Sequence, residues 1–229
     1  HDMIFHDVIP LRDILEPEVD ALVVGVYGLG FVGLTLACTF ANAGLSVIGI
    51  DTNAQLVDNL RRGIPPFYEK GLDSVLSSLH STNPIAFTSD GTDRSIDAHV
   101  VSVGSPVDAE GRPDLSHLTA ATRTIAARLK RGDLVVFRST VPVGTMRQIV
   151  LPILETSGLF CGSDFHLAFA PERTVEGNAL EELRRLPQIV GGLNKTSSAM
   201  AARLFARITS TIIEVESLEE AELVKLMNN

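Results

Sequence analysis

A glycine-rich segment near the start of the chain, residues 28–33, has the composition and spacing of a loop that holds a pyrophosphate. It follows the apolar run 21–27 and precedes small and apolar residues at helical spacing. The first glycine allows a tight turn, the second a close approach to the phosphates, and the third close packing of helix on sheet. We therefore expect the helix start to bind a dinucleotide through Gly28, Leu29, Gly30, Phe31, Val32 and Gly33.

An acid, Asp51, directly follows the second apolar run, residues 45–50. In this position a carboxylate accepts hydrogen bonds from the adenosine ribose, and its charge repels the extra phosphate of NADP. The pattern therefore predicts NAD as the cofactor. Two alternatives remain: an ordinary strand-to-helix turn with a helix-capping Asp, and a methyltransferase, which also places a Gly-rich turn and an acid here.

Strand-like and helix-like segments alternate along almost the whole chain, which predicts a doubly wound, mainly parallel α/β sheet of the Rossmann type. No repeat or low-complexity tract divides it. The expected strands are 21–27, 45–50, 85–87, 99–103, 134–137, 166–170, 189–190 and 212–215. The expected helices are 31–43, 54–62, 72–79, 115–129, 146–154 and 197–207, with a last one that starts after Ser217.

Ligands bind beyond the carboxyl ends of the strands in open α/β sheets, so the residues that follow strands are candidates for the site. Three clusters qualify: 104–106, 138–145 and 171–177. We assign Gly104 and Ser105, in the first cluster, to the cofactor side of the site.

Several segments together resemble the UDP-sugar 6-dehydrogenases, which oxidise the C6 alcohol of the sugar to a carboxylate with two NAD. The resemblance covers nearly the whole chain after residue 20. It is carried by GLGFVGLTLA with Asp51, EKGL at 69–72, STVPVGT at 139–145, PERTVEG at 171–177, LPQIVGG at 186–192 and AELVKLMNN at 221–229. PERTVEG and LPQIVGG are more similar to the UDP-N-acetylmannosamine or UDP-N-acetylglucosamine branch than to the UDP-glucose branch.

The resemblance implies a role for each of five residues. Thr140 would contact the catalytic water and the nicotinamide, Glu172 would act as an acid/base or position water, and Glu176 would support it. Lys225 and Asn229, four apart on one helix face, would stabilise the C6 oxyanion. Glu172 could take up protons if burial raises its pKa towards neutrality.

Each of these residues also has a purely structural interpretation. Thr140 could bind a loop amide, and Glu172 and Glu176 could complement a helix dipole. Lys225 could pair with Glu222 on a solvated helix face.

The cysteine nucleophile that the resemblance implies does not match either cysteine of this chain. Cys38 falls in the first Rossmann helix, as a small core residue, and Cys161 falls in a loop. We therefore expect three parts: a leader with a tag remnant over 1–20, the NAD-binding domain over 21–215, and the start of a central helix over 217–229. The resemblance implies that a C-terminal UDP-sugar domain with the cysteine follows, and that the full enzyme is a homodimer.

The formal charge of −9 and the absence of a dense basic run argue against a nucleic-acid partner. The cysteine spacing fits neither a disulfide framework nor a metal site. With no long apolar run for a membrane and no signal-peptide pattern, we expect a cytoplasmic protein. Three other functions remain open: a UDP-glucose 6-dehydrogenase, a hydroxy-acid or acyl dehydrogenase, and a non-catalytic NAD-binding module.

Overall fold

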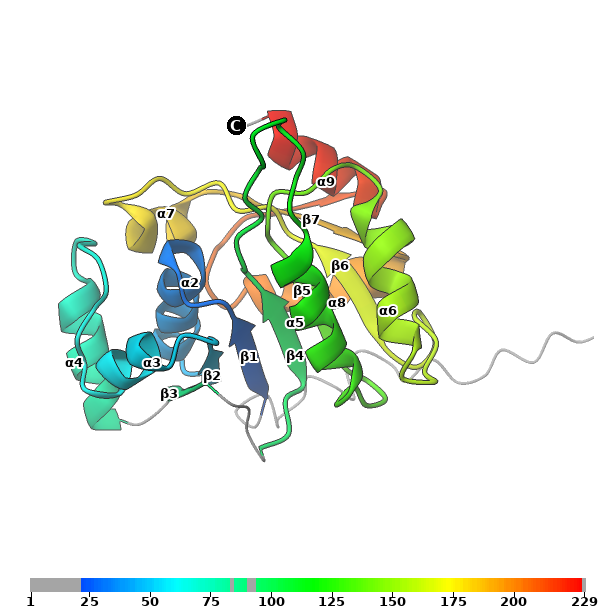
Figure 1. The fold of residues 1–229 in the computed structure, drawn as a ribbon. Helices are drawn as coiled ribbons and strands as arrows, with labels where there is room; N and C mark the ends of the chain where they lie inside the picture. Colours follow the sequence, from blue (N-terminus) through cyan, green and yellow to red (C-terminus); the bar gives the residue numbers. More distant parts are fainter. Residues whose placement is uncertain (1–21, 83–84, 90–93, 228–229) are drawn as a thin grey trace, which may run out of the picture.

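The computed structural model describes residues 22–82, 85–89 and 94–227. Its strands form one twisted sheet (Figure 1). The order of the strands is β3-β2-β1-β4-β5-β6-β7-β8. All neighbours are parallel except β6 and β7. The strands are β1 (Val23–Tyr27), β2 (Ser46–Ile50), β3 (Ile85–Thr88), β4 (Ala98–Val101), β5 (Leu134–Phe137), β6 (His166–Phe169), β7 (Gln188–Gly192) and β8 (Ile212–Val215). The predicted doubly wound, mainly parallel fold is confirmed.

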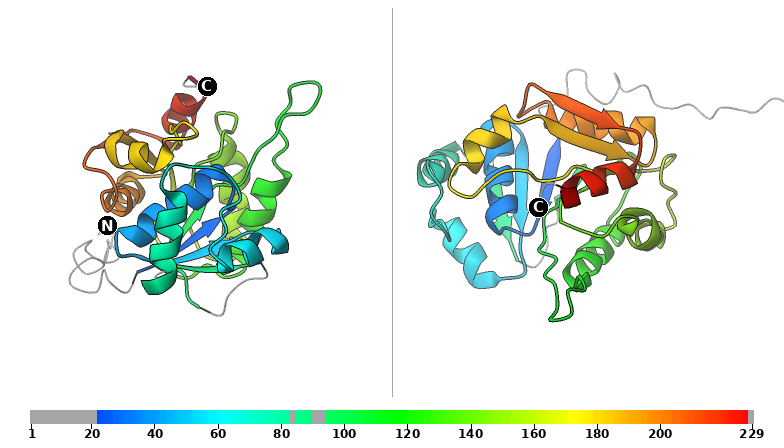
Figure 2. Two further views of the ribbon diagram at one scale, coloured as in Figure 1. Left: turned by 90° about the vertical axis from the view of Figure 1, so that its left-hand side faces the viewer. Right: turned by 90° about the horizontal axis from the view of Figure 1, so that it is seen from above.

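Helices cover both faces of the sheet, and alternate residues of the central strands pack against each layer (Figure 2). In β5, Leu134 and Val136 belong to one hydrophobic cluster, whereas Val135 and Phe137 belong to the other. The first cluster includes α2 (Phe31–Asn42), α3 (Ala54–Arg61), α4 (Leu72–Thr82), α7 (Ala179–Arg185) and α8 (Lys195–Phe205). The second includes α5 (Ser116–Ala126), η2 (Met146–Val150), α6 (Leu151–Glu155) and α9 (Leu218–Met227).

Two helical segments differ from the sequence-based expectation. The helix expected over 146–154 is divided into the π-helix η2 and the short α6. Pro152 lies in the first turn of α6, and because proline lacks an N–H and clashes with the carbonyl four residues earlier, a regular α-helix cannot run through it. Helix α7 was not predicted, since its seven residues bury only Ala179 and Leu183.

The last helix, α9, packs over the ends of β6 and β7 (Figure 2, right). It begins as predicted, because the Oγ of Ser217 accepts a hydrogen bond of 3.1 Å from the amide of Glu220. Both carboxylate oxygens of the buried Glu222 accept backbone hydrogen bonds, from Gly144 at 2.6 Å and Met146 at 2.8 Å. These bonds fix α9 to the segment that opens η2.

The expected leader over 1–20, Ala21 of the first predicted strand and Asn229 lie outside the described residues. Within the residues that are described, no helix has the length and apolar character needed to cross a membrane.

Candidate functional site

The glycine-rich loop between β1 and α2 has a backbone that only glycine accommodates at two positions. Gly28 has a φ of +86°, and a Cβ there would lie 3.0 Å from the backbone of Val103. A Cβ on Gly33 would lie 1.7 Å from the carbonyl oxygen of Gly28, so this glycine lets α2 pack against the turn. Gly30 differs, because nothing lies within 4 Å of the Cβ position there. This open side of Gly30 is where a phosphate could approach the helix start.

Asp51 lies at the carboxyl end of β2, and its side chain fixes the same loop. Its Oδ2 accepts a hydrogen bond of 2.7 Å from the amide of Leu29, and its Oδ1 accepts one of 2.9 Å from Asn53. The side chain of Leu29 is fully buried in the core. Leu29 therefore holds the acid in place, rather than offering its amide to a pyrophosphate as the sequence suggested.

A cavity of about 800 Å³ opens in front of this loop, beyond the ends of β1, β2 and β4. Its volume is within the range of small-molecule and cofactor sites. The Oγ of Ser102, one of the lining residues, is buried and has no hydrogen-bond partner among the described residues. An unpaired buried hydroxyl is costly, so a ligand that bonds to Ser102 would be stabilised here. The lining includes Tyr27, Gly28, Gly30, Asp51, Thr52, Ser102, Val103, Gly104, His117 and Arg128.

Ala120 and Thr124 of α5, with its C-cap residue Ala127, line one wall of the cavity with small side chains. Sequence reasoning missed this wall, although the spacing of small residues at one-turn intervals was a usable signal. The open side of Gly30, the acid and the unpaired hydroxyl together fit NAD.

Two side-chain hydrogen bonds link the start of the loop after β4 to the start of the loop after β5. The hydroxyl of Ser105 donates a hydrogen bond to the carbonyl oxygen of Thr140, and the Oγ of Ser139 donates one of 2.6 Å to Val103. Gly104 lines the cofactor cavity. Gly104, Ser105 and Thr140 therefore meet at the carboxyl edge of the sheet, as their positions after neighbouring strands predicted.

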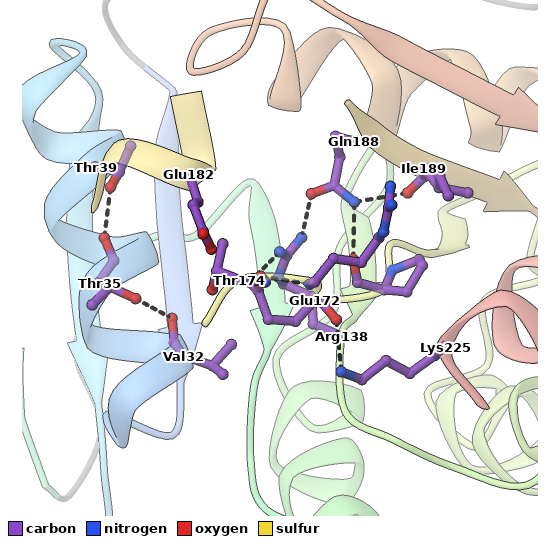
Figure 3. A network of polar contacts seen from close by, with 12 residues as sticks. Val32, Thr35, Thr39, Arg138, Glu172, Thr174, Glu182, Gln188, Ile189 and Lys225 are labelled. Carbon is purple, nitrogen blue, oxygen red and sulfur yellow. Dashed lines mark hydrogen bonds and ion pairs between the residues drawn. The ribbon is translucent and has the colours of Figure 1, made fainter. Parts of the chain in front are cut away.

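A buried polar network surrounds Glu172, which follows β6 (Figure 3). The guanidinium of Arg138 donates to Glu172 Oε2 at 2.5 Å and to Gln188 Oε1 at 3.0 Å. It also lies 4.8 Å from the ring centroid of Phe205. Gln188 donates in turn to the carbonyl oxygen of Pro171 at 3.2 Å. Arg138 is fully buried, and these contacts replace the hydration of its two terminal nitrogens, whereas its Nε has no hydrogen-bond partner among the described residues.

The charge of Arg138 determines the protonation of Glu172. Burial acts to raise the pKa of Glu172, but the adjacent guanidinium and the hydrogen bonds to Arg138 and Thr174 outweigh it and hold this pKa below its ordinary value. The condition considered from the sequence, that burial raises the pKa of Glu172 towards neutrality, is therefore not met, because Arg138 lies beside this carboxylate.

Lys225 reaches the same network from α9. Its Nζ donates a hydrogen bond of 2.6 Å to the carbonyl oxygen of Glu172, and burial lowers the pKa of its half-buried ammonium. The alternative pairing with Glu222 does not form, since that carboxylate accepts the amides that open η2.

The remaining candidates are less closely assembled. Glu176 is exposed in the loop between β6 and α7. Asn229 lies outside the described residues. Cys38 is fully buried, which confirms it as a core residue, and burial raises the pKa values of both Cys38 and Cys161 to about 12. A thiol with so high a pKa is a poor nucleophile.

Residues 22–209 match the sequence profile of the UDP-glucose/GDP-mannose dehydrogenase family, NAD binding domain. The chain belongs to this family. Its match extends over most of the described sheet and includes the glycine-rich loop, Asp51 and Glu172. NAD is the cofactor of this family of domains, in agreement with the cavity.

Characterised relatives of this family are similar over about 90% of the chain. The UDP-N-acetyl-D-mannosamine dehydrogenase of Pyrococcus horikoshii is 32% identical over 207 residues, which are 90% of this chain and 49% of the relative. The NDP-N-acetyl-D-galactosaminuronic acid dehydrogenase of Ralstonia nicotianae is 34% identical, over 93% of this chain and 51% of the relative. The chain thus spans about half the length of these relatives.

Solved structures of the family have the same architecture. The UDP-N-acetyl-mannosamine dehydrogenase of Staphylococcus aureus is 31% identical with a TM-score of 0.85, over 90% of this chain and 50% of that one. The GDP-mannose dehydrogenase of Pseudomonas aeruginosa is 28% identical with a TM-score of 0.83, over 89% of this chain and 48% of that one.

Proposed function

We propose that this protein is the cofactor domain of an NAD-dependent enzyme that oxidises the C6 alcohol of UDP-N-acetylmannosamine or UDP-N-acetylglucosamine to the uronate, with two NAD per sugar. One observation carries the proposal: the cavity beside the glycine-rich loop lies at the same sheet edge as the linked pair of Glu172 and Lys225. The names of similar enzymes support the substrate class.

In the proposed complex, NAD accepts the hydride that leaves C6 of the sugar. The first turn of α2 holds the pyrophosphate through its amides, and Asp51 binds the adenosine ribose. The negative charge of Asp51 disfavours the additional phosphate of NADP. Ser102 and Gly104 line the same cavity.

The polar network would act on the sugar. Lys225 would stabilise the negative oxygen that develops at C6, because it is a fixed cation with donors beyond the one bonded to Glu172. Since Arg138 keeps Glu172 ionised, this carboxylate would orient a water molecule or hydroxyl by accepting its proton in a hydrogen bond. Thr140 would contact the nicotinamide side, and Glu176 and Asn229 would complete the polar surround.

The proposal divides the chain into the cofactor domain over 21–215 and the start of a central helix over 217–229. The cysteine nucleophile and the rest of the sugar pocket are assigned to further sequence of the full-length enzyme. We also propose a homodimer, supported by the exposed Leu223, Leu226 and Met227 on α9, and a cytoplasmic location, supported by the unpaired Cys38 and Cys161.

The test is NADH formation by the full-length protein with UDP-N-acetylmannosamine, UDP-N-acetylglucosamine, UDP-glucose and GDP-mannose as separate substrates. We expect turnover with one of the two N-acetylated sugars and two NADH per uronate. Preference for UDP-glucose, or turnover of a hydroxy acid alone, would contradict the assigned substrate. NAD binding without turnover of any of these substrates would instead show a binding module.

A further inference from the structure

The loop that carries Glu172 and Glu176, residues 171–178, is held by carboxylates from three directions. The Oε1 of Glu172 accepts hydrogen bonds of 2.7 Å from the amides of Arg173 and Thr174, and Glu182 accepts one of 2.7 Å from Val175. Hydrogen bonds to a charged acceptor are among the stronger ones in proteins. The path of this loop is therefore determined by where these carboxylates lie.

The third carboxylate comes from far away in the sequence. The Oε2 of Glu69 accepts a hydrogen bond of 2.8 Å from the amide of Gly177, and its Oε1 accepts one of 3.4 Å from Leu180. Glu69 lies between α3 and α4 and is only 3% exposed. Among the described residues Glu69 forms no ion pair, and a buried carboxylate without a cationic partner is costly, so its position depends on the amides of Gly177 and Leu180.

The segment that carries Glu69 also touches the glycine-rich loop. Phe67 lies two residues earlier, and the centroid of its ring is 5.3 Å from the ring centroid of Phe31, with an interplanar angle of 55°. Phe31 is the first residue of α2, at the helix start that would bind the pyrophosphate. On the other side, Gly71 makes a turn with a φ of +85° and Leu72 is fully buried, which anchors the segment to the core.

We propose that Glu69 is a positioning residue that couples the pyrophosphate loop, residues 28–33, to the loop 171–178. The inference rests on the NAD binding proposed above and extends it. Cofactor binding fixes the first turn of α2, the contact between Phe31 and Phe67 fixes the neighbouring segment, and Glu69 then fixes Gly177 and Leu180. By this path a bound cofactor orders the carboxylates that face the sugar.

A second physical path between the same two loops has to be separated from this one. Helix α7, which follows the loop, packs directly on α2. Coupling through this contact would not require Glu69. The two paths predict different effects of a substitution at position 69, because the contact between α7 and α2 contains no atom of that residue.

The experiment is hydrogen exchange of the protein with and without NAD, for the wild type and Glu69→Ala. In the wild type we expect NAD to slow exchange at both 28–33 and 175–180. In Glu69→Ala the protection at 28–33 remains. With NAD bound, the amides of 175–180 exchange about tenfold faster in this variant than in the wild type, because one hydrogen bond to a charged acceptor is lost. Because coupling is reciprocal, the affinity for NAD falls by about fivefold or more.

Three further variants make the result specific. Glu69→Gln keeps one acceptor oxygen and restores part of the protection. Glu181→Ala removes an exposed carboxylate on α7 that pairs with Arg185 at 2.7 Å, and leaves protection unchanged. Phe67→Ala removes the contact with Phe31, together with some packing against the core, and leaves Glu69 in place. It lowers the NAD-dependent protection at 175–180 even if Glu69→Ala does not fold.

Protection at 28–33 without protection at 175–180 in the wild type would overturn the coupling and leave NAD binding intact. Full protection at 175–180 in Glu69→Ala or Phe67→Ala would assign the coupling to the contact between α7 and α2 and so overturn the role of Glu69. No protection at 28–33 in the wild type would contradict NAD binding itself, and with it the basis of the inference.

Discussion

The Nζ of Lys225 donates a hydrogen bond of 2.6 Å to the backbone carbonyl of Glu172. Residues on the last helix and on the loop after β6, separated by 53 positions, are therefore joined at one point of the proposed site. This contact holds the ammonium of Lys225 next to the loop that carries Glu172. The carboxylate of Glu172 is kept ionised by Arg138.

Replacing Lys225 by Ala is expected to lower kcat of the full-length enzyme by about 100- to 1,000-fold, the effect of losing one donor to a developing oxyanion. The KM for the sugar should change much less, because the donor acts mainly in the transition state. Initial-rate kinetics measure both. The exposed Lys195→Ala variant is the matched control, and an equal loss of kcat in both variants would contradict the assigned role.

Replacing Gly30 by Ala separates folding from cofactor binding. Nothing lies within 4 Å of the new Cβ, so Tm should stay within a few degrees of the wild type, whereas NAD affinity falls because the Cβ fills the phosphate approach. Gly33→Ala is the contrasting variant, because its Cβ would lie 1.7 Å from the carbonyl oxygen of Gly28. It should lower Tm and binding together. Calorimetric titration and thermal melting measure these effects, and unchanged NAD affinity in Gly30→Ala would place the pyrophosphate elsewhere.

Replacing Asp51 by Ala is expected to weaken NAD binding by about tenfold or more, because the ribose loses a charged acceptor. The preference for NAD over NADP should also decline, since the repelling charge is removed. Asp51→Asn keeps an acceptor for the amide of Leu29 and separates the charge from the loop geometry. Titrations with both cofactors measure the ratio, and an unchanged preference would refute the role of the charge.

Replacing Arg138 by Met leaves the buried Glu172 without its cation. We expect a loss of about 3–5 kcal/mol in the free energy of unfolding, the usual cost of breaking a buried ion pair. Arg131, which is exposed and paired with Asp164, offers the control, since Arg131→Ala should cost no more than about 1 kcal/mol. Urea denaturation distinguishes the two. Equal effects would mean that the buried pair contributes nothing particular to stability.

The stability of the domain should also depend on a buried histidine. The Nδ1 of His99 lies 2.9 Å from the hydroxyl of Tyr27, and its Nε2 lies 3.3 Å from Asp133. Burial, only partly opposed by Asp133, lowers the pKa of His99. The unfolded chain therefore binds a proton that the folded chain does not, and the free energy of unfolding falls as the pH drops below about 6.5.

Denaturation between pH 5 and 8 measures this slope, and His99→Gln should flatten it. The exposed His117→Gln variant should leave it unchanged. Glu172 acts in a lower range, because its depressed pKa contributes stability that is lost only as the pH falls below about 4.5 towards its folded value. A slope near pH 6 that persists in His99→Gln would assign the titration to another group.

The sequence by itself determined the order and type of nearly all elements, and it predicted the residues of the cofactor half of the site. Short, nearly continuous apolar runs such as 45–50, between turn residues, are typical of strands buried on both faces of a sheet, and a glycine spacing followed by an acid constrains the backbone locally. Both signals depend on residues close together in the chain. For the same reason, the positions of Gly104, Thr140 and Glu172 after successive strands were enough to bring them to one edge.

Only the tertiary structure decided which side chains meet across the sheet. Arg138 and Glu172 are 34 positions apart, and Glu69 and Gly177 are 108 apart, so no local pattern shows that either pair is in contact. The condition considered from the sequence, a pKa of Glu172 raised by burial, therefore is not met in the folded protein. A pKa depends on the charges and the burial around the group, and both are set by the packing of segments that are remote in the chain.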